Sequence, residues 1–262
     1  MRLAIIIPAR YGSTRFEGKP LAPLLGKPMI RHVYERAAMA RLSDSVVVAT
    51  DDERIACSVK GFGGTVVITS GSHQTGTDRI AEVAAGLDVE WIINLQGDEP
   101  LIQPEVIDLL ARSMMGAPHE HMFSLMRPVC TVDEYMNPHA VKVVTDHQGY
   151  ALYFSRAPIP CPKGGWSHLQ GVSEDHPAVK NAHIHCGIYG YRKDFLLTIP
   201  SMRPSALECT EGLEQLRILS NGHRIVMIRT EYRAIGVDTP EDIAVVEELL
   251  RREKRSLMPG AG

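Results

Sequence analysis

Three features that would each indicate a class of partner or site are missing from this sequence. Positive charge is not in excess, because the formal net charge is −3, whereas proteins that bind nucleic acid carry clustered positive charge. The five cysteines are odd in number and no two are spaced as CxxC, which argues against a disulfide framework or a zinc ribbon. No apolar run approaches the ~20 residues of a membrane span. We therefore expect a cytoplasmic protein with no nucleic-acid or membrane partner.

Short apolar runs alternate with amphipathic stretches in the first half of the chain. The runs predict strands at residues 3–7, 46–49, 65–69 and 91–95, and the stretches between them predict helices at residues 28–40, 51–61, 77–85 and 104–115. This order is typical of an α/β fold, a three-layer sandwich with a mostly parallel sheet. Right-handed crossovers bring the carboxyl ends of such strands to one edge, where ligands usually bind.

The second half of the chain has a less regular pattern. Residues 140–145 and 150–154 flank a polar turn and predict a hairpin. Residues 158–181 are rich in Pro, Gly and His and predict a long loop, which in a compact domain is usually functional or mobile. A strand is expected at 183–191, one helix at 207–220 and a last helix at 237–254.

The segment PARYGSTRFEGKP, residues 8–20, directly follows the first predicted strand. It combines three cations with two glycines and a serine: Arg10, Arg15, Lys19, Gly12, Gly18 and Ser13. Backbone N–H groups and cations on a tight loop suit a triphosphate. The loop is not a Walker A motif, because GxxxxGK[ST] is absent. From spacing alone, a phosphate site and a solvated basic loop are equally supported.

Two carboxylates from distant parts of the chain follow predicted strands or precede predicted helices. Asp98 lies in LQGDEP after the fourth strand, and Asp238 lies in GVDTPED before the last helix. Magnesium prefers one or two carboxylates together with substrate phosphates. Each Asp alone is more often a turn or cap residue, but Thr239 is expected to supply the N-cap of the last helix. Asp238 is then free to bind a metal.

Other polar groups allow both a functional and a structural interpretation. In HQTGTDR, Gly76 and Thr77 precede a helix, so their N–H groups can bind a ligand or Thr77 can simply cap the helix. Later acidic and amide side chains share the face of the predicted helix 207–220, which suits a polyol but equally a solvated surface: Glu208, Glu211, Glu214 and Gln215. His183 and His185 lack a third ligand for a transition metal.

The chain resembles the 3-deoxy-manno-octulosonate (Kdo) cytidylyltransferase family, also called CMP-Kdo synthetases, from Ala4 to about Leu250. The motifs that carry the resemblance occur in the family's order: PARYGSTR with GKPL, HQTGTDR, QGDEP, NPHAVKVV, YALYFSRAPIP, GIYGYR, LEQLR and GVDTPED. The first of these alone would indicate the wider class of sugar-acid cytidylyltransferases. The combination of YFSRAPIP, LEQLR and GVDTPED points to the Kdo branch.

The resemblance implies a fold like that of nucleotide-diphospho-sugar transferases, in one domain over residues 1–262. Residues 1–130 would mainly bind CTP, 131–235 would bind the sugar acid and support a homodimer, and 236–262 would form the metal-ligand turn and last helix. It implies CTP-binding residues at Pro8, Ala9, Arg10, Ser13, Arg15, Lys19, Gly76, Thr77 and Gln96. It implies sugar-acid-binding residues at Arg156, His185, Tyr189, Glu211 and Gln215.

The implied reaction transfers CMP from CTP to Kdo with Mg2+ as cofactor, for lipopolysaccharide biosynthesis. Asp98 and Asp238 would bind the metal, and Lys19 and Arg10 would join them as catalytic residues. Phe16-Glu17 stands where the family more often has Leu-Pro, and Cys186 where Leu or Ile is common. Two alternatives remain: another sugar acid such as 8-amino-Kdo or sialic acid, and a nucleotide-binding regulatory protein, which would not need both aspartates.

Overall fold

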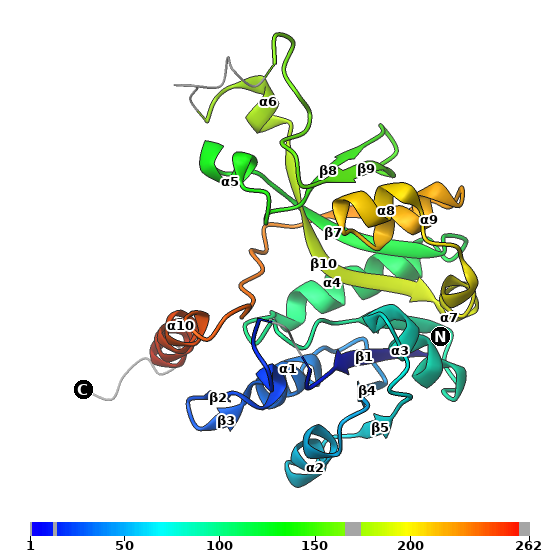
Figure 1. The fold of residues 1–262 in the computed structure, drawn as a ribbon, viewed down its shortest axis with the longest axis vertical. Coiled ribbons are helices and arrows are strands. Elements are labelled where there is room, and N and C mark those ends of the chain that lie inside the picture. The colour runs from blue at the N-terminus through cyan, green and yellow to red at the C-terminus, as the bar shows by residue number, and fades with distance from the viewer. Residues whose placement is uncertain (1, 13–14, 166–173, 257–262) are drawn as a thin grey trace. The chain divides into compact units, whose positions relative to one another are not determined.

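The chain forms two compact units in the computed structural model, which describes residues 2–12, 15–165 and 174–256 (Figure 1). The first unit joins two separate stretches, Met1–Arg112 and Ala234–Gly262, and the second is Ser113–Arg233. The division falls inside helix α4 (Pro104–Gly116). Across the described residues, no helix is both long enough and apolar enough to cross a membrane.

Four parallel strands form the sheet of the first unit, and all four were predicted. In spatial order they are β6 (Trp91–Asn94), β1 (Leu3–Ala9), β4 (Ser45–Thr50) and β5 (Val66–Ile68). The register pairs Ile6 of β1 with Val47 on one side and Asn94 on the other. Strand β6 is wholly buried and β1 nearly so, which explains why their sequences are apolar without alternation.

The predicted helices of the first unit connect these strands. They are α1 (Met29–Ala37), α2 (Glu53–Gly61), α3 (Gly76–Ala85) and the start of α4. The right-handed rule puts α1 and α2 on one face of the sheet and α3, which crosses back from β5 to β6, on the other. The α2 N-cap is Asp52, whose carboxylate accepts from the backbone N–H of Arg54 at 2.9 Å. The expected α/β layering is therefore present.

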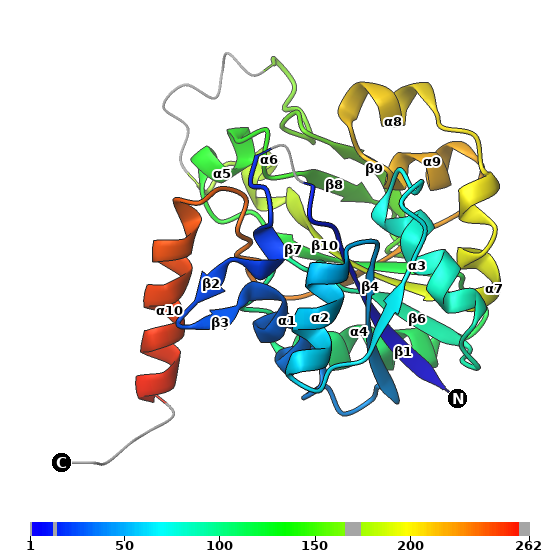
Figure 2. The ribbon, with the colours of Figure 1, turned by 60° about the horizontal axis from the view of Figure 1, so that its bottom comes forward.

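The last helix, α10 (Asp242–Ser256), packs beside a small hairpin that was not predicted, β2 (Pro23–Leu24) with β3 (Lys27–Pro28) (Figure 2). The Glu247 side chain accepts from the Leu25 backbone N–H at 2.8 Å. A buried apolar cluster joins the two parts: Ala22, Leu24, Met29, Val237, Val246 and Leu250. Within the first unit, apolar packing and a hydrogen bond thus hold the C-terminal stretch against the N-terminal stretch.

The strands of the second unit are mostly antiparallel. They are β7 (Met122–Pro128), β8 (Lys142–Thr145), β9 (Ala151–Ser155), β10 (His183–Arg192) and β11 (Val226–Arg229). Strand β10 pairs antiparallel with β7 and β8, and β8 pairs antiparallel with β9, whereas β11 runs parallel to its neighbour β7. The hairpin β8–β9 and strand β10 confirm the predictions there. Strands β7 and β11 were not predicted.

The single helix expected over residues 207–220 is wrong. The structure has two helices there, α8 (Ala206–Glu211) and α9 (Gln215–Ser220). Gly212 adopts a left-handed conformation with φ 63° and ψ 40°, which ends α8. Glu211 and Gln215 therefore do not share a helix face. The predicted end of the segment near Gly222 is confirmed, since α9 stops at Ser220 and Gly222 has a φ of 80°.

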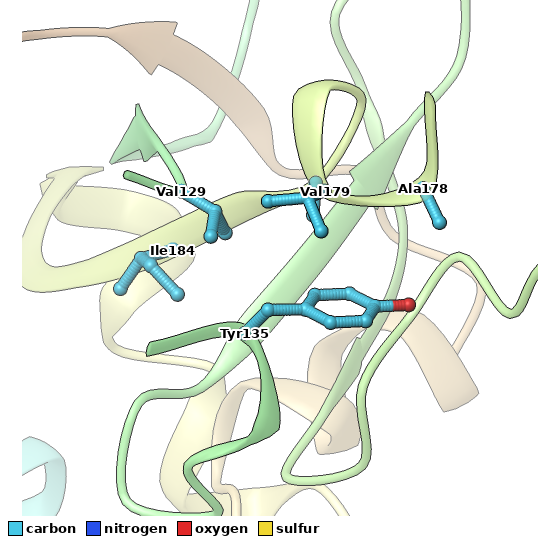
Figure 3. Close-up of a cluster of buried hydrophobic side chains, with 6 residues drawn as sticks. Val129, Tyr135, Ala178, Val179 and Ile184 are labelled. Atoms are coloured by element: carbon cyan, nitrogen blue, oxygen red, sulfur yellow. The ribbon is translucent and has the colours of Figure 1, made fainter. Parts of the chain in front are cut away.

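Short helices complete the second unit. They are α5 (Val132–Met136), α6 (Pro177–Lys180), α7 (Lys193–Leu196) and the 3-10 helix η3 (Ile199–Ser201). A cluster around Tyr135 packs α5 against α6 and β10, and Figure 3 shows the Tyr135 ring directed toward Val179 and Ala178. The Tyr135 hydroxyl donates to the Pro160 carbonyl at 2.6 Å. The predicted long loop over 158–181 therefore ends in a helix that is packed into a core.

Candidate active site

The carboxyl edge of the first unit's sheet brings three predicted segments together. Pro8 lies near the end of β1, Gly76 begins α3, and Gly97 follows β6. A Cβ on Gly97 would lie 3.0 Å from the Pro8 carbonyl oxygen, and one on Gly76 would lie 3.5 Å from the Pro8 ring. The approach at Gly97 is tight enough to favour glycine, whereas a Cβ on Gly76 would make an ordinary van der Waals contact, so both the loop after β6 and the α3 N-terminus meet the end of β1.

Lys19 lies at the centre of this edge. Its Nζ donates to Asp98 Oδ2 at 2.6 Å and to the Val237 carbonyl at 2.9 Å, and it lies 3.7 Å from Asp238 Oδ1. The Lys19 side chain is only 14% exposed. Residues that are distant in the sequence thus converge on one ammonium group, as the sequence analysis expected for Lys19, Asp98 and Asp238.

The two carboxylates form a donor set that suits magnesium. Asp98 and Asp238 both direct an oxygen at the same cation, the Lys19 ammonium. Magnesium is usually held by one or two carboxylates and by oxygens of substrate phosphates and water, not by a full protein cage. In the part of the chain that the structure describes, no three His, Cys, Asp or Glu side chains form a metal-binding group. The two aspartates therefore fit a metal ion whose remaining ligands are phosphate oxygens of a substrate and water.

Asp238 is not needed to cap the turn, because Asp242 does so. The Asp242 carboxylate accepts from the backbone N–H groups of Asp238 and Thr239, both at 2.8 Å, and these bonds lower the Asp242 pKa. The expected N-cap geometry at Thr239 is wrong in detail, since α10 begins at Asp242 and the Thr239 hydroxyl donates to Asp242. The Asp242 carboxylate satisfies the turn, and Asp238 points elsewhere.

The predicted phosphate loop lies beside these carboxylates. Arg15 Nη2 is 3.1 Å from Asp238 Oδ1, and Arg10 follows β1 with an exposed side chain. Ala9 is buried at the end of β1, and Ser13 lies outside the described residues. Phe16, the residue that departs from the family pattern, packs against the apolar cluster of α10 and the β2–β3 hairpin. The cations of the loop are therefore gathered at the carboxyl edge of the sheet.

Tyr11 and Arg54 order this loop, and the sequence analysis missed both. The Arg54 guanidinium lies 3.3 Å from the centroid of the Tyr11 ring, and Gly18 donates its N–H to the Tyr11 carbonyl at 2.9 Å. A Cβ on Gly18 would lie 3.0 Å from the Tyr11 ring, and Gly18 has a φ of 69°. Arg54 is in turn paired with Asp52, the cap of α2. The stack ties the loop to α2, a contact that sequence patterns do not reveal.

Arg54→Ala should weaken CTP binding without changing turnover. An exposed cation–π contact contributes roughly 0.5–1 kcal/mol, so we expect the KM for CTP to rise about two- to fivefold. Arg2→Ala is a matched control, because Arg2 also forms an exposed ion pair, with Asp88, but precedes β1 at the opposite edge of the sheet. Steady-state kinetics with varied CTP would decide. An equal rise in both variants would mean that the stack does not order the loop.

The α3 N-terminus is capped by Thr75 and not by Thr77. The Thr75 hydroxyl accepts from the Asp78 N–H at 3.1 Å and the Asp78 carboxylate accepts from the Thr75 N–H, which is a capping box. Thr77 is buried inside the first turn. Gln96 lies in the loop after β6 and is partly buried. Capping by Thr77 is thus wrong, and the contact of Gly76, Thr77 and Gln96 with cytidine stays a prediction.

In the second unit, the side chains of Arg156 and Glu211 each form a hydrogen bond with the backbone of the other residue. The Glu211 carboxylate accepts from the Arg156 N–H at 2.9 Å and from the Ser155 hydroxyl at 2.6 Å, while Arg156 Nε donates to the Glu211 carbonyl at 2.7 Å. Burial raises the Glu211 pKa, but these bonds, together with the contact to Tyr153, outweigh it and leave the pKa below its usual value, so the group stays ionised. The structure thus brings together the predicted Arg156 and Glu211 and uses Glu211 to fasten α8 to β9.

Lys142 supports the same cluster and was missed by the sequence analysis. Its side chain is fully buried, and Nζ donates to the Asn137 carbonyl at 2.7 Å and the Arg156 carbonyl at 2.8 Å. Burial lowers the pKa of Lys142 to about 8, and the Glu211 charge opposes that shift. Lys142 occurs in the NPHAVKVV motif, but a lysine in a strand pattern gives no sign that it will be buried.

The remaining predicted sugar-acid residues lie on β10 and α9. The His185 ring lies 5.3 Å from the Tyr189 ring, and burial raises the Tyr189 pKa. Gln215 begins α9 and is buried. Glu208, grouped with these residues by the helical pattern, instead pairs with Arg217 at 2.6 Å and completes the capping box of α8. That pairing is structural, so Glu208 is removed from the polar face expected to bind a polyol.

Comparisons with known proteins identify the family of this chain. A family model described as cytidylyltransferase matches residues 4–225. Relatives named 3-deoxy-manno-octulosonate cytidylyltransferase include those of Syntrophotalea carbinolica, 52% identical over 96% of this chain and 99% of the relative, and Geobacter sulfurreducens, 51% identical over 96% and 100%.

A solved structure, described as CMP:2-keto-3-deoxy-manno-octonic acid synthetase complexed with CTP, also matches. It is 39% identical with a TM-score of 0.87, and the match covers 97% of this chain and 100% of that one. The match therefore extends over nearly the whole of both chains. This chain therefore belongs to the cytidylyltransferase family and, within it, to the 3-deoxy-manno-octulosonate cytidylyltransferases.

Proposed function

We propose that this chain transfers CMP from CTP to the anomeric C2 hydroxyl of Kdo, giving CMP-Kdo and pyrophosphate. The observation that carries the proposal is the convergence of Asp98 and Asp238 on Lys19, beside a loop of further cations. A related solved structure is described as a complex with CTP, and the relatives are named for Kdo, which supports the choice of both substrates.

The reaction needs no covalent enzyme intermediate. The C2 oxygen of Kdo attacks the α-phosphorus of CTP, the new C–O–P bond forms, and the bond from the α-phosphorus to the bridging oxygen of the β-phosphate breaks. The hydroxyl proton leaves to solvent and the electron pair of the broken bond leaves with pyrophosphate. Positioning and charge neutralisation supply most of the rate in such transfers.

The residues of the first unit would neutralise charge on the triphosphate. Lys19 is held by the Asp98 carboxylate and the Val237 carbonyl, so its charge is fixed in place before substrate arrives. Arg10 and Arg15 have exposed side chains that can turn toward phosphate oxygens. Preorganised cations of this kind stabilise charge that moves toward the leaving group.

Asp98 and Asp238 would hold Mg2+, which when bound polarises phosphate oxygens and lowers the pKa of a coordinated hydroxyl. Both aspartates keep exposed carboxylate surface, so they can bind a metal that is also bound by phosphate. The donor set is compatible with one ion held by the protein and with a second held mainly by the triphosphate.

Arg156 would bind the carboxylate of the sugar acid. A guanidinium has five N–H groups, and three of them donate to the carbonyls of Glu211, Pro138 and Gly212. Counting partners among the described residues alone, one N–H on each terminal nitrogen remains for an anion. Glu211 would then act through its hold on the Arg156 backbone, while His185, Tyr189 and Gln215 would contact hydroxyl groups.

Pyrophosphate release tests the proposal. With CTP and Kdo we expect release that needs Mg2+ and stops on chelation, with no release from CTP alone. Parallel reactions with 8-amino-Kdo and with sialic acid separate the closest alternatives. Release with one of these acids and none with Kdo would overturn the choice of substrate, and no release with any acid would favour a binding protein.

We further propose a cytoplasmic homodimer that supplies CMP-Kdo for lipopolysaccharide biosynthesis. The support is the resemblance of the chain to its family, since Kdo is activated before it is transferred to a lipid acceptor. Light scattering on the purified protein gives the molar mass directly. A mass near 28.9 kDa, that of one chain, would contradict the dimer.

A further inference from the structure

Ser124 is a buried hydroxyl in the middle of β7. It is fully enclosed, and three groups lie within hydrogen-bond distance of its Oγ: the Ile188 carbonyl at 2.9 Å, the Cys186 carbonyl at 3.2 Å and His185 Nε2 at 2.9 Å. The carbonyls are close because the register between β10 and β7 shifts between Cys186 and Tyr189. Such a bulge disrupts the ladder locally and leaves the extra residues unpaired.

Counting protons fixes the direction of these bonds. A serine hydroxyl has one proton to donate and can accept through its lone pairs, whereas a carbonyl can only accept. If the Ser124 proton went to Nε2, both carbonyls would face the serine oxygen with no proton between them, so the proton is assigned to a carbonyl, of which Ile188 is the nearer. If His185 Nε2 were also an acceptor, it would face the Ser124 oxygen with no proton between them. Nε2 must therefore carry the proton and donate it to Ser124.

The His185 ring is neutral and held in a fixed orientation. Burial lowers its pKa to about 4, so it carries no charge near neutral pH. The Phe154 ring meets it edge-on at 5.0 Å and 77°, and the Tyr189 ring lies at 5.3 Å. In a neutral imidazole only one nitrogen carries a proton. A proton on Nε2 therefore leaves Nδ1 as an acceptor.

Nδ1 is the ring nitrogen that remains for a ligand. His185 is partly exposed, and the Ser124 hydroxyl toward which Nε2 points is fully buried. Among the residues that the structure describes, every hydrogen bond of the ring is made by Nε2. An acceptor nitrogen attracts a hydroxyl proton and repels a carboxylate, so it can contact only one part of a sugar acid.

We infer that Ser124 is a positioning residue that holds His185 as the Nε2–H tautomer, so that Nδ1 accepts a hydrogen bond from a hydroxyl group of the sugar acid. The second half of this inference rests on the proposed function, and the first half does not. His185 then helps to orient the substrate by accepting from one of its hydroxyl groups, while N–H groups of Arg156 bind its carboxylate.

Nitrogen NMR on protein labelled with 15N-histidine tests the tautomer without substrate. We expect the resonances of His185, assigned by their loss in His185→Asn, to show a protonated Nε2 and an unprotonated Nδ1 at pH 7. Ser124→Ala should shift the ring toward the Nδ1–H form, and Ser124→Thr should restore the Nε2–H form. An Nδ1–H tautomer in the unsubstituted protein would overturn the inference whatever the substrate is.

Kinetics test the contact with the substrate. Ser124→Ala should raise the KM for Kdo about tenfold while the KM for CTP stays unchanged, and Ser124→Thr should recover most of the loss. A second pair avoids dependence on the folding of the serine variants: His185→Asn places an amide oxygen near the position of Nδ1, whereas His185→Gln reaches the position of Nε2. We expect the KM for Kdo to be lower in His185→Asn than in His185→Gln.

The two experiments separate the possible failures. An Nε2–H tautomer combined with equal KM values for His185→Asn and His185→Gln would overturn the Nδ1 contact while leaving the tautomer in place. Absence of Kdo turnover in the unsubstituted protein would instead reject the proposed function, and the tautomer would still be decided by NMR.

Discussion

Asp98→Asn should reduce turnover about a thousandfold or more while the fold survives. Asparagine has nearly the same shape but removes the negative charge that faces Lys19 at 2.6 Å. The change weakens the proposed magnesium site and removes one of the two hydrogen-bonded partners that fix the ammonium, and loss of a preorganised electrostatic group alone costs about 10²–10³ in rate. The rate of pyrophosphate release and the circular dichroism spectrum measure the two parts of this prediction.

Asp88→Asn is the matched control for that variant. Asp88 also forms a short ion pair, with Arg2, but its side chain is 86% exposed. We expect its turnover to remain within about twofold of the unsubstituted protein, since exposed pairs contribute little. If Asp98→Asn also kept near-normal turnover, Asp98 could not be a metal ligand and the proposed mechanism would fail.

Lys142→Met should reveal a buried charge in the second unit through the pH dependence of stability. The folded protein releases the Lys142 proton near pH 8, whereas the unfolded chain holds it to about 10.5. Between these values the unfolded chain binds more protons, so the free energy of unfolding of the native sequence rises with pH relative to the variant. The total difference is about 3 kcal/mol, of which about 2 kcal/mol falls between pH 7.5 and 9.5.

Urea unfolding of both proteins at the two pH values measures this difference. Lys60→Met provides the control, because it is the same substitution at a lysine that lies exposed on α2. A constant difference between Lys142→Met and the native sequence across this range would mean that Lys142 ionises as a solvated lysine does. At low pH the buried ammonium destabilises the fold because it is removed from water. Its hydrogen bonds to two carbonyls compensate part of that free energy.

The fold of the first unit could be predicted because its strands are buried and its connections are short. Continuous apolar runs marked β1, β4 and β6, and the rule that parallel strands end at one edge was enough to expect Lys19 and Asp98 to meet. The second unit was harder. Its antiparallel pairs join distant segments, and strands β7 and β11 have no neighbouring turn signal that would mark them as a hairpin.

Three local features lay beyond sequence patterns. The left-handed conformation of Gly212 separates α8 from α9, although a glycine inside a helical pattern is often tolerated. The bulge in β10 that brings Ser124 to His185 depends on pairing with β7. The burial of Lys142 depends on carbonyls of Asn137 and Arg156, which approach only in the folded unit. Each of these three features depends on tertiary contacts, which the local pattern of apolar and polar residues does not reveal.

The discontinuous first unit has a consequence for synthesis of the protein. Lys19 and Asp98 precede the second unit in the chain, but the Val237 carbonyl and Asp238 follow it, and the Val237 N–H also bonds to the Asp98 carbonyl at 2.9 Å. A ribosome must therefore complete the whole second unit before the last groups around Lys19 emerge. A nascent or prematurely terminated chain lacks Asp238, one of the two carboxylates proposed to bind the metal, so we expect it not to consume CTP before the residues proposed to bind the sugar acid have been made.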